Sequence, residues 1–145
     1  MEITSIPFVK KLGLEQNQDR VLQLTFNETV QNHLHTFHAG AIFTLAETAS
    51  GDALQQIFPE LVGKVVPVLR DAQVKFKKPA TNTITAFSSV TEEDISQFRA
   101  FLGKKGRALI AVSVEVRDTD GMVVCLGVFN WFIQRLKPTA QGVSA

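Results

Sequence analysis

The chain has 145 residues, with 15 Lys and Arg against 14 Asp and Glu and a formal net charge of +1. Its 45% hydrophobic content can build a core, which excludes global disorder. A single Cys excludes an internal disulfide and a cysteine-based zinc site. The balanced charge argues against a dedicated nucleic-acid binder. We therefore expect one soluble, cytoplasmic domain over residues 1–145.

Neither a targeting segment nor a membrane span is expected. Residues 1–7 lack the basic start and apolar run of a secretory signal. The apolar stretches are interrupted within about ten residues, whereas a membrane helix needs roughly 20. The end of the chain is small and polar, which predicts a flexible tail over 136–145. Residues 1–19 are expected to form an N-terminal helix or extension.

The first part of the chain predicts a short helix, a strand and a long helix. Residues 4–15 form the short helix, with Pro7 tolerated in its first turn and Gly13 ending it. Apolar and polar residues alternate over 20–27, which predicts a half-buried strand. Residues 39–58 are rich in Ala and contain no Pro, so they predict the long helix.

The rest of the chain predicts strands in an antiparallel run. Their expected ranges are 65–78, 83–90, 108–117 and 122–134. The pair Asp120-Gly121 predicts a hairpin turn before the last strand. Residues 91–94 resemble a capping box and predict a short helix, because apolar residues follow at helical spacing. Residues 103–106 are expected to form a turn.

Apolar residues lie on two sides of the long helix. The main stripe consists of Phe43, Ala46, Ser50, Ala53, Leu54 and Ile57. Leu45 and Ala49 add apolar surface on the opposite side. A sheet that wraps around the helix would bury both sides. The expected fold class is therefore α+β, with a sheet of about five antiparallel strands around one long helix.

The strongest functional signal lies where the long helix begins. His38 is followed by the small residues Ala39 and Gly40, which leave backbone N–H groups open at the positive end of the helix dipole. Such groups can polarise a carbonyl oxygen. Glu47 lies about two turns further on, beside the apolar stripe. Partial burial there would raise its pKa toward a range useful for acid–base catalysis.

Each of these residues also has a simpler interpretation. Glu47 could be a solvated residue at the border of the stripe, and Asn32 alone is best explained as a turn residue. His33, His35 and His38 have a tolerable spacing for a metal, but loop histidines more often bond to the backbone. No metal is expected.

The pattern formed by Asn32, His38-Ala39-Gly40 and Glu47 resembles the active-site signature of hot-dog-fold acyl-CoA thioesterases. That signature has Asn, then His-Gly-Gly, then a helix carboxylate at the same spacing, and the phenylacetyl-CoA thioesterase branch is the most similar. Three further motifs also fit: Phe76-Lys77-Lys78-Pro79-Ala80, Arg117-Asp118-x-x-Gly121 and a final apolar strand containing Trp131.

The resemblance implies hydrolysis of acyl-CoA thioesters by a homodimer or homotetramer with active sites between subunits. It implies no cofactor, because CoA is part of the substrate, and neither nucleic acid nor membrane as a partner. Glu47 takes the place of the general base or nucleophile. Ala39 takes the place of the Gly whose N–H polarises the thioester carbonyl, with Gly40 beside it. Asn32 matches the residue that orients the carbonyl or the attacking water.

The expected substrate-binding residues form a larger set. They are His38, Phe43, Ser50, Lys75, Lys77, Lys104 and Lys105. The lysines would form a basic rim for the CoA phosphates, although a solvated strand face explains them as well. The sequence departs from the family pattern at Ala39 and at His35, where the family often has Gly. Gly51 lacks the hydroxyl that some members have, and Ser50 could replace it.

Two other functions stay open at this point. A hot-dog dehydratase of 3-hydroxyacyl thioesters uses a His and a helix carboxylate, and His33 has a suitable spacing from Glu47. However, the Phe-Pro-Gly that follows the dehydratase His is absent here. A non-catalytic module that binds acyl-CoA or lipid would keep the same fold without turnover. The acyl group is not specified by the sequence.

Overall fold

The computed structural model describes residues 1–137, so most of the tail expected over 136–145 lies outside the described residues. The helices are α1 (Pro7–Leu12), α2 (Ala39–Ile57) and α3 (Glu92–Lys105), with 3₁₀ turns η1 (Ile3–Ser5), η2 (Glu28–Val30) and η3 (Pro59–Leu61). The strands are β1 (Glu15–Gln16), β2 (Leu22–Leu24), β3 (Val65–Phe76), β4 (Ile84–Ser89), β5 (Arg107–Arg117) and β6 (Val123–Arg135). No helix among these residues is long and apolar enough to cross a membrane.

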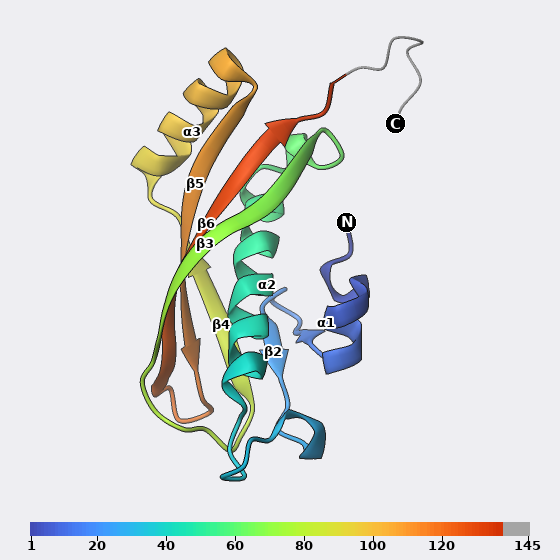
Figure 1. The fold of residues 1–145 in the computed structure, drawn as a ribbon, viewed down its shortest axis with the longest axis vertical. Coiled ribbons are helices and arrows are strands. Elements are labelled where there is room, and N and C mark those ends of the chain that lie inside the picture. The colour runs from blue at the N-terminus through green and yellow to red at the C-terminus, as the bar shows by residue number, and fades with distance from the viewer. Residues whose placement is uncertain (138–145) are drawn as a thin grey trace.

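The strands form one antiparallel sheet that wraps around α2 (Figure 1). This α+β arrangement confirms the hot-dog fold, with six strands because the two-residue β1 extends one edge. The strand order β1-β2-β4-β5-β6-β3 corrects the expected run of consecutive strands. β3 pairs with β6 over most of its length, and this leaves β4 to pair with β2. β3 is therefore a long edge strand.

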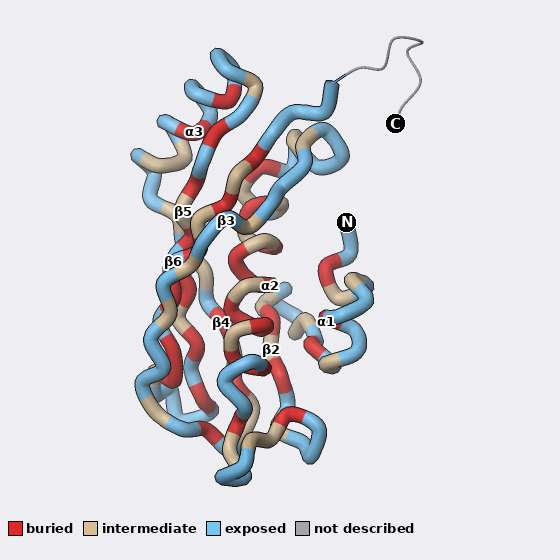
Figure 2. The backbone as a smooth tube through the Cα atoms, viewed as in Figure 1, coloured by how far each residue is buried: buried red, intermediate tan, exposed pale blue. Residues whose placement is uncertain are grey.

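α2 occupies the concave side of the sheet and is buried on both sides, as its sequence predicted (Figure 2). Leu45 and Ala46 are completely buried. Ala, Ser and Gly let the sheet approach the helix backbone closely, while the absence of Pro keeps its hydrogen bonds intact. The edge strand β3 is exposed along most of its length in the same view.

Two predicted helices differ in extent from the observed ones. The first is a 3₁₀ turn followed by α1, with Pro7 at its first position and Gly13 at φ +89° ending it. In α3, the Thr91 hydroxyl accepts the N–H of Asp94 at 3.1 Å, as the capping box predicted. α3 then continues through residues 103–105, which corrects the turn expected there. Lysines in the last turn favour this extension, because they stabilise the negative end of the helix dipole.

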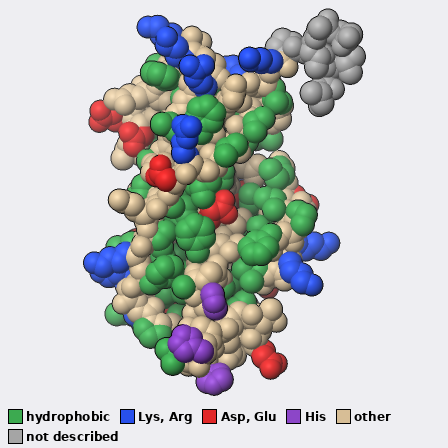
Figure 3. Space-filling view, viewed as in Figure 1, with side chains coloured by type: hydrophobic (Ala, Val, Ile, Leu, Met, Phe, Trp, Pro, Cys, Tyr) green, Lys and Arg blue, Asp and Glu red, His purple; other side chains and the backbone are tan. Residues whose placement is uncertain are grey.

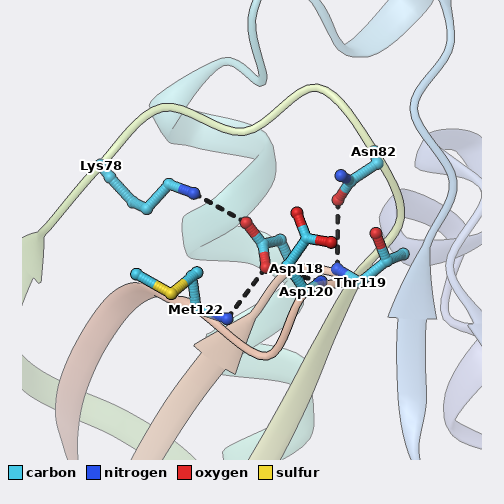
Figure 4. A network of polar contacts seen from close by, with 6 residues as sticks. All are labelled: Lys78, Asn82, Asp118, Thr119, Asp120 and Met122. Carbon is cyan, nitrogen blue, oxygen red and sulfur yellow. Dashed lines mark hydrogen bonds and ion pairs between the residues drawn. The ribbon is translucent and has the colours of Figure 1, made fainter.

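The β5–β6 hairpin is organised by a buried carboxylate (Figure 4). Asp118 accepts the N–H groups of Asp120 and Met122 at 3.0 and 2.9 Å. The Lys78 ammonium donates to the other Asp118 oxygen at 2.7 Å and ties the segment after β3 to the hairpin. This contact with Lys78 lowers the pKa of Asp118 below its ordinary value. These motif residues therefore have a structural role.

Candidate active site

Asn32 organises the loop that leads into α2. Its side-chain oxygen accepts the N–H groups of Leu34 and Thr36 at 2.9 and 3.1 Å. Its amide nitrogen donates to the Thr36 hydroxyl at 2.8 Å and to the Phe37 carbonyl at 3.2 Å. Both ends of the Asn32 amide are thus engaged inside the loop. These contacts agree with the interpretation of Asn32 as a turn residue. Its bond to the Phe37 carbonyl also fixes the backbone just before His38.

His35 adopts a left-handed backbone conformation in this loop, with φ at +61°. Gly is the residue that accepts this conformation without steric cost. The thioesterase signature often has Gly at this position, and the conformation of His35 is one that favours Gly. The loop keeps its shape with His35 because the hydrogen bonds of Asn32 hold it from both sides.

His38 caps the N-terminus of α2. Its Nδ1 accepts the N–H of Gly40 at 2.8 Å, so the imidazole proton is on Nε2. A Cβ at Gly40 would lie only 3.0 Å from that Nδ1, which explains the Gly after the small Ala39. Within residues 1–137, no group accepts the N–H of Ala39, and Ala39 is exposed. The structure thus separates the two expected donors: Gly40 is engaged and Ala39 is open.

The Glu47 carboxylate has no partner among the described residues, either by hydrogen bond or by ion pair. The residue is half-buried, and this burial raises the pKa of Glu47 above its ordinary value. The face of the molecule in Figure 3 is rich in hydrophobic side chains, with an acidic group among them. A carboxylate that is partly desolvated and unpaired is available to take a proton.

The residues one turn before and one turn after Glu47 on α2 show that it faces β6. Phe43, one turn before it, packs edge to face on Phe129 of β6 at 5.6 Å between ring centroids. Gly51, one turn after it, faces the Trp131 ring. Glu47 therefore lies over β6 between these two aromatic residues. The register between β3 and β6 shifts at this same level, so a bulge of the edge strand lies there.

Ser50 lies in the interior and is completely buried. Its hydroxyl donates to the Glu47 carbonyl at 2.6 Å and accepts the Trp131 indole N–H at 2.9 Å. This hydroxyl therefore both donates and accepts a hydrogen bond within the fold. Ser50 therefore fixes Trp131 against α2, and the substrate contact expected for it has no support in this geometry.

The expected basic rim is divided between two ends of the sheet. Lys75 is level with Glu115 of β5, because both pair with Leu126. Lys104 and Lys105 end α3, and only Gly106 separates them from Arg107, the first residue of β5. Eight residues of extended strand between Arg107 and Glu115 span about 27 Å. β3 ends near the start of α2, so Lys75 and Lys77 are at the Ala39 end of the molecule, whereas Lys104 and Lys105 are at the other end (Figure 1).

The three histidines do not converge on a metal. His33, His35 and His38 are exposed, and residues 1–137 contain no group of three or more His, Cys, Asp and Glu side chains able to hold an ion. The lone Cys125 is buried, and burial raises the pKa of its thiol to about 11, so it is a poor nucleophile.

One polar cluster beside the site was missed from the sequence. Asp52 is buried, and its carboxylate accepts amide hydrogens from Gln16, Gln55 and Gln56 at 3.0, 3.0 and 2.7 Å. Gln55 also donates to the Met1 carbonyl at 2.9 Å, which holds the N-terminal segment on α2. A carboxylate within an apolar helix was the signal available in the sequence, and the two Gln residues that follow it supply two of its three partners.

Comparisons with known proteins agree with this fold and also assign the chain to a family. A family model described as a domain of unknown function, DUF4442, matches residues 6–133. No curated protein gave a match. A Pseudomonas aeruginosa protein of unknown function, named a probable thioesterase, is 24% identical, with a TM-score of 0.74 over 92% of this chain and 91% of its own.

Two other solved structures share the fold. A thioesterase from Haemophilus influenzae is 16% identical, with a TM-score of 0.74 over 93% of this chain and 87% of its own. A Bacillus halodurans protein solved with CoA is 23% identical, with a TM-score of 0.67 over 87% of this chain and 74% of its own. At these identities the likeness concerns the fold. Because the family model spans nearly all of the sheet and α2, the chain is a hot-dog domain that belongs to the DUF4442 family.

Proposed function

We propose that this protein hydrolyses acyl-CoA thioesters to the free acid and CoA. The observation that carries the proposal is the half-buried Glu47 carboxylate, which has no partner among residues 1–137 and a pKa raised by burial. The open N–H of Ala39 at the start of the same helix supplies a donor for a carbonyl oxygen. The solved thioesterases of the same fold, and the one bound to CoA, support the substrate class.

In the proposed reaction, the Glu47 carboxylate takes a proton from water, and the resulting hydroxide attacks the thioester carbon. The carbonyl oxygen becomes an oxyanion that accepts the N–H of Ala39. The C–S bond then breaks, and the CoA thiolate takes the proton back from Glu47. Direct attack by Glu47 would instead form an anhydride that water hydrolyses, and the same two groups serve both routes.

The Ala39 N–H and the Glu47 carboxylate can act on one substrate if they come from two subunits that meet at an interface. Ala39 and Glu47 are eight residues apart on α2, a rise of about 12 Å. A carbonyl oxygen must lie about 3 Å from its donor, while its carbon meets the attacking water. We therefore propose a homodimer, in which Glu47 of one copy acts with Ala39 of the other. The exposed edge strand β3 offers a surface for pairing with a second copy, and a tetramer could form from such dimers.

The other site residues take revised roles in this proposal. His38 and Asn32 position the start of α2, since their side chains bond within the loop and to Gly40. Lys75 and Lys77, exposed at the end of β3, are the lysines proposed to contact CoA phosphates. Lys104 and Lys105 could contribute only from another copy, because their own α3 ends at the far end of the sheet.

The direct test is release of free thiol from a panel of saturated acyl-CoA esters by the purified protein. Turnover of at least one ester is the expected result. A dehydratase would release no thiol but would hydrate a 2-enoyl-CoA, and a binding module would retain acyl-CoA without thiol release. Either of these two outcomes would overturn the proposal. Sedimentation analysis in the same buffer tests the dimer, which a monomer with full activity would contradict.

A further inference from the structure

An apolar cavity of about 300 Å³ lies beside the second half of α2. Gly51, Leu54 and Phe58 contribute its helix side, and Trp131 of β6 contributes its sheet side. No charged side chain is among the described residues that line it. The face in Figure 3 shows hydrophobic side chains gathered over this part of the molecule. A cavity with this lining favours an apolar ligand over a polar one.

This cavity lies on the same side of α2 as Glu47, one to two turns closer to the C-terminus of the helix. Gly51 and Leu54 lie four and seven residues after Glu47, so all three share one stripe of α2. A group that enters beside the Glu47 carboxylate and runs toward the C-terminus of α2 passes over Gly51. A Cβ at Gly51 would come within 3.2 Å of the Trp131 ring, so Gly lets this ring pack directly against the helix backbone and form the sheet side of the cavity.

The N-terminal segment forms the far wall of the cavity. Met1, Ile3 and Ile6 line it opposite the sheet. The Gln55 amide holds this segment by donating to the Met1 carbonyl at 2.9 Å, and Asp52 orients the same amide at 3.0 Å. Burial of Ile3 against the core adds to this anchor. The depth of the cavity is therefore set by a segment that a polar clamp fixes to α2.

We infer that this cavity binds the acyl group of the substrate and selects apolar chains of medium length, an inference that rests on the proposed thioesterase function. A cavity of about 150 Å³ holds one benzene ring, so twice that volume fits about eight to twelve carbons. Shorter chains leave the cavity partly empty and lose roughly fourfold in affinity per missing methylene. Longer chains meet the wall that Met1 and Ile3 form.

The test measures kcat/KM for acetyl-, butyryl-, decanoyl- and palmitoyl-CoA with wild type, Val65→Phe and Val128→Phe. Val65 lines the cavity, whereas Val128 is exposed on the face of β6 that points away from α2 and lies outside the edge strand proposed for pairing, so the two variants are a matched pair. Wild type should prefer decanoyl-CoA. Val65→Phe should lower its kcat/KM at least about tenfold while butyryl-CoA stays within about twofold. Val128→Phe should keep the wild-type profile.

Binding of S-decyl-CoA, a thioether that cannot be hydrolysed, separates this inference from the proposed function. If no ester is hydrolysed but wild type binds the thioether and Val65→Phe weakens binding, hydrolysis is wrong and the cavity assignment holds. If esters are hydrolysed with a flat chain-length profile, and the two variants behave alike, the cavity assignment is wrong and hydrolysis holds. Gln55→Ala should loosen the wall and raise the relative rate on palmitoyl-CoA; an unchanged ratio would contradict the role of the clamp.

Discussion

Two carboxylates on α2, Glu47 and Asp52, lie five residues apart and have opposite surroundings. Asp52 is buried, and three glutamine amides donate to it. Glu47 is half-buried, and nothing among residues 1–137 donates to it. The N-terminal half of the helix therefore carries a carboxylate without a donor among the described residues, about 12 Å along the axis from the open N–H of Ala39. The C-terminal half uses its carboxylate to hold the N-terminal segment over an apolar cavity.

This difference separates a group that stabilises the fold from one that is available for chemistry. A buried carboxylate with several donors has its hydrogen-bonding capacity used within the fold. A partly desolvated carboxylate without donors costs stability as long as it is charged. Such a group is retained at a site where protonation and deprotonation are useful. Isosteric substitutions at the two positions can test the distinction.

The largest effect on stability is expected for Asp52→Asn. The new amide would face three amide donors with one NH₂ group of its own, so acceptors are lost without a change of shape. We expect the free energy of unfolding to fall by about 2–3 kcal/mol, measured by urea denaturation at pH 7. Glu47→Gln in the same assay should cause no loss. An equal loss for both variants would remove the distinction between the two carboxylates.

A medium effect is expected for His38→Ala, at the open end of α2. The variant removes the acceptor for the Gly40 N–H, and the loss of an N-cap typically costs about 1 kcal/mol. Urea denaturation checks this value. His33→Ala, an exposed residue of the same loop, is the control and should change stability little. If the two variants were equally stable, the cap would have no energetic role.

The pH dependence of stability gives a smaller effect with a defined sign. Because burial raises the pKa of Glu47 above 4.5, the folded state binds the proton more tightly than the unfolded state does. This contribution to stability is complete below the unfolded pKa and is lost as the pH rises through the folded pKa. Wild type should therefore gain stability relative to Glu47→Gln as the pH falls toward 4.5. A difference that does not vary with pH would contradict a raised pKa.

The smallest effect is expected for His35→Gly. The substitution relieves a left-handed backbone conformation that costs a non-Gly residue roughly 1–2 kcal/mol, while Gly adds entropy to the unfolded chain. A net gain of about 0.5 kcal/mol should appear as a small rise in the urea midpoint. A loss of stability would show that the His35 side chain contributes more than its backbone costs.

Local patterns were sufficient to predict most of the elements and the start of α2. The Ala-rich composition, the proline that follows and the alternating strands predicted α2 and most of the sheet. The position of β3 at the sheet edge was not predictable, because strand pairing depends on contacts between distant segments. The extension of α3 through Lys105 combines a local cause, the lysines of its last turn, with a distant one, the burial of Phe98 and Leu102.

The candidate site divides in a similar way. Residue types and spacing were enough to single out Glu47 and Ala39. The roles of Gly40 and Ser50 depended on hydrogen bonds that only the structure shows. The Gly40 N–H donates to His38, and the Ser50 hydroxyl accepts the indole N–H of Trp131. The cavity and its wall were invisible in the sequence, because Met1, Gln55 and Trp131 meet only through folding.

The catalytic role of Glu47 is tested most directly by thiol release from decanoyl-CoA at pH 7 with wild type and Glu47→Gln. Glu60→Gln, an exposed surface carboxylate after α2, is the matched control. We expect Glu47→Gln to stay folded, to bind S-decyl-CoA as wild type does, and to lose at least about a hundredfold in kcat. The control should keep its full rate. Unchanged turnover in Glu47→Gln would contradict the assignment of Glu47 as the catalytic carboxylate.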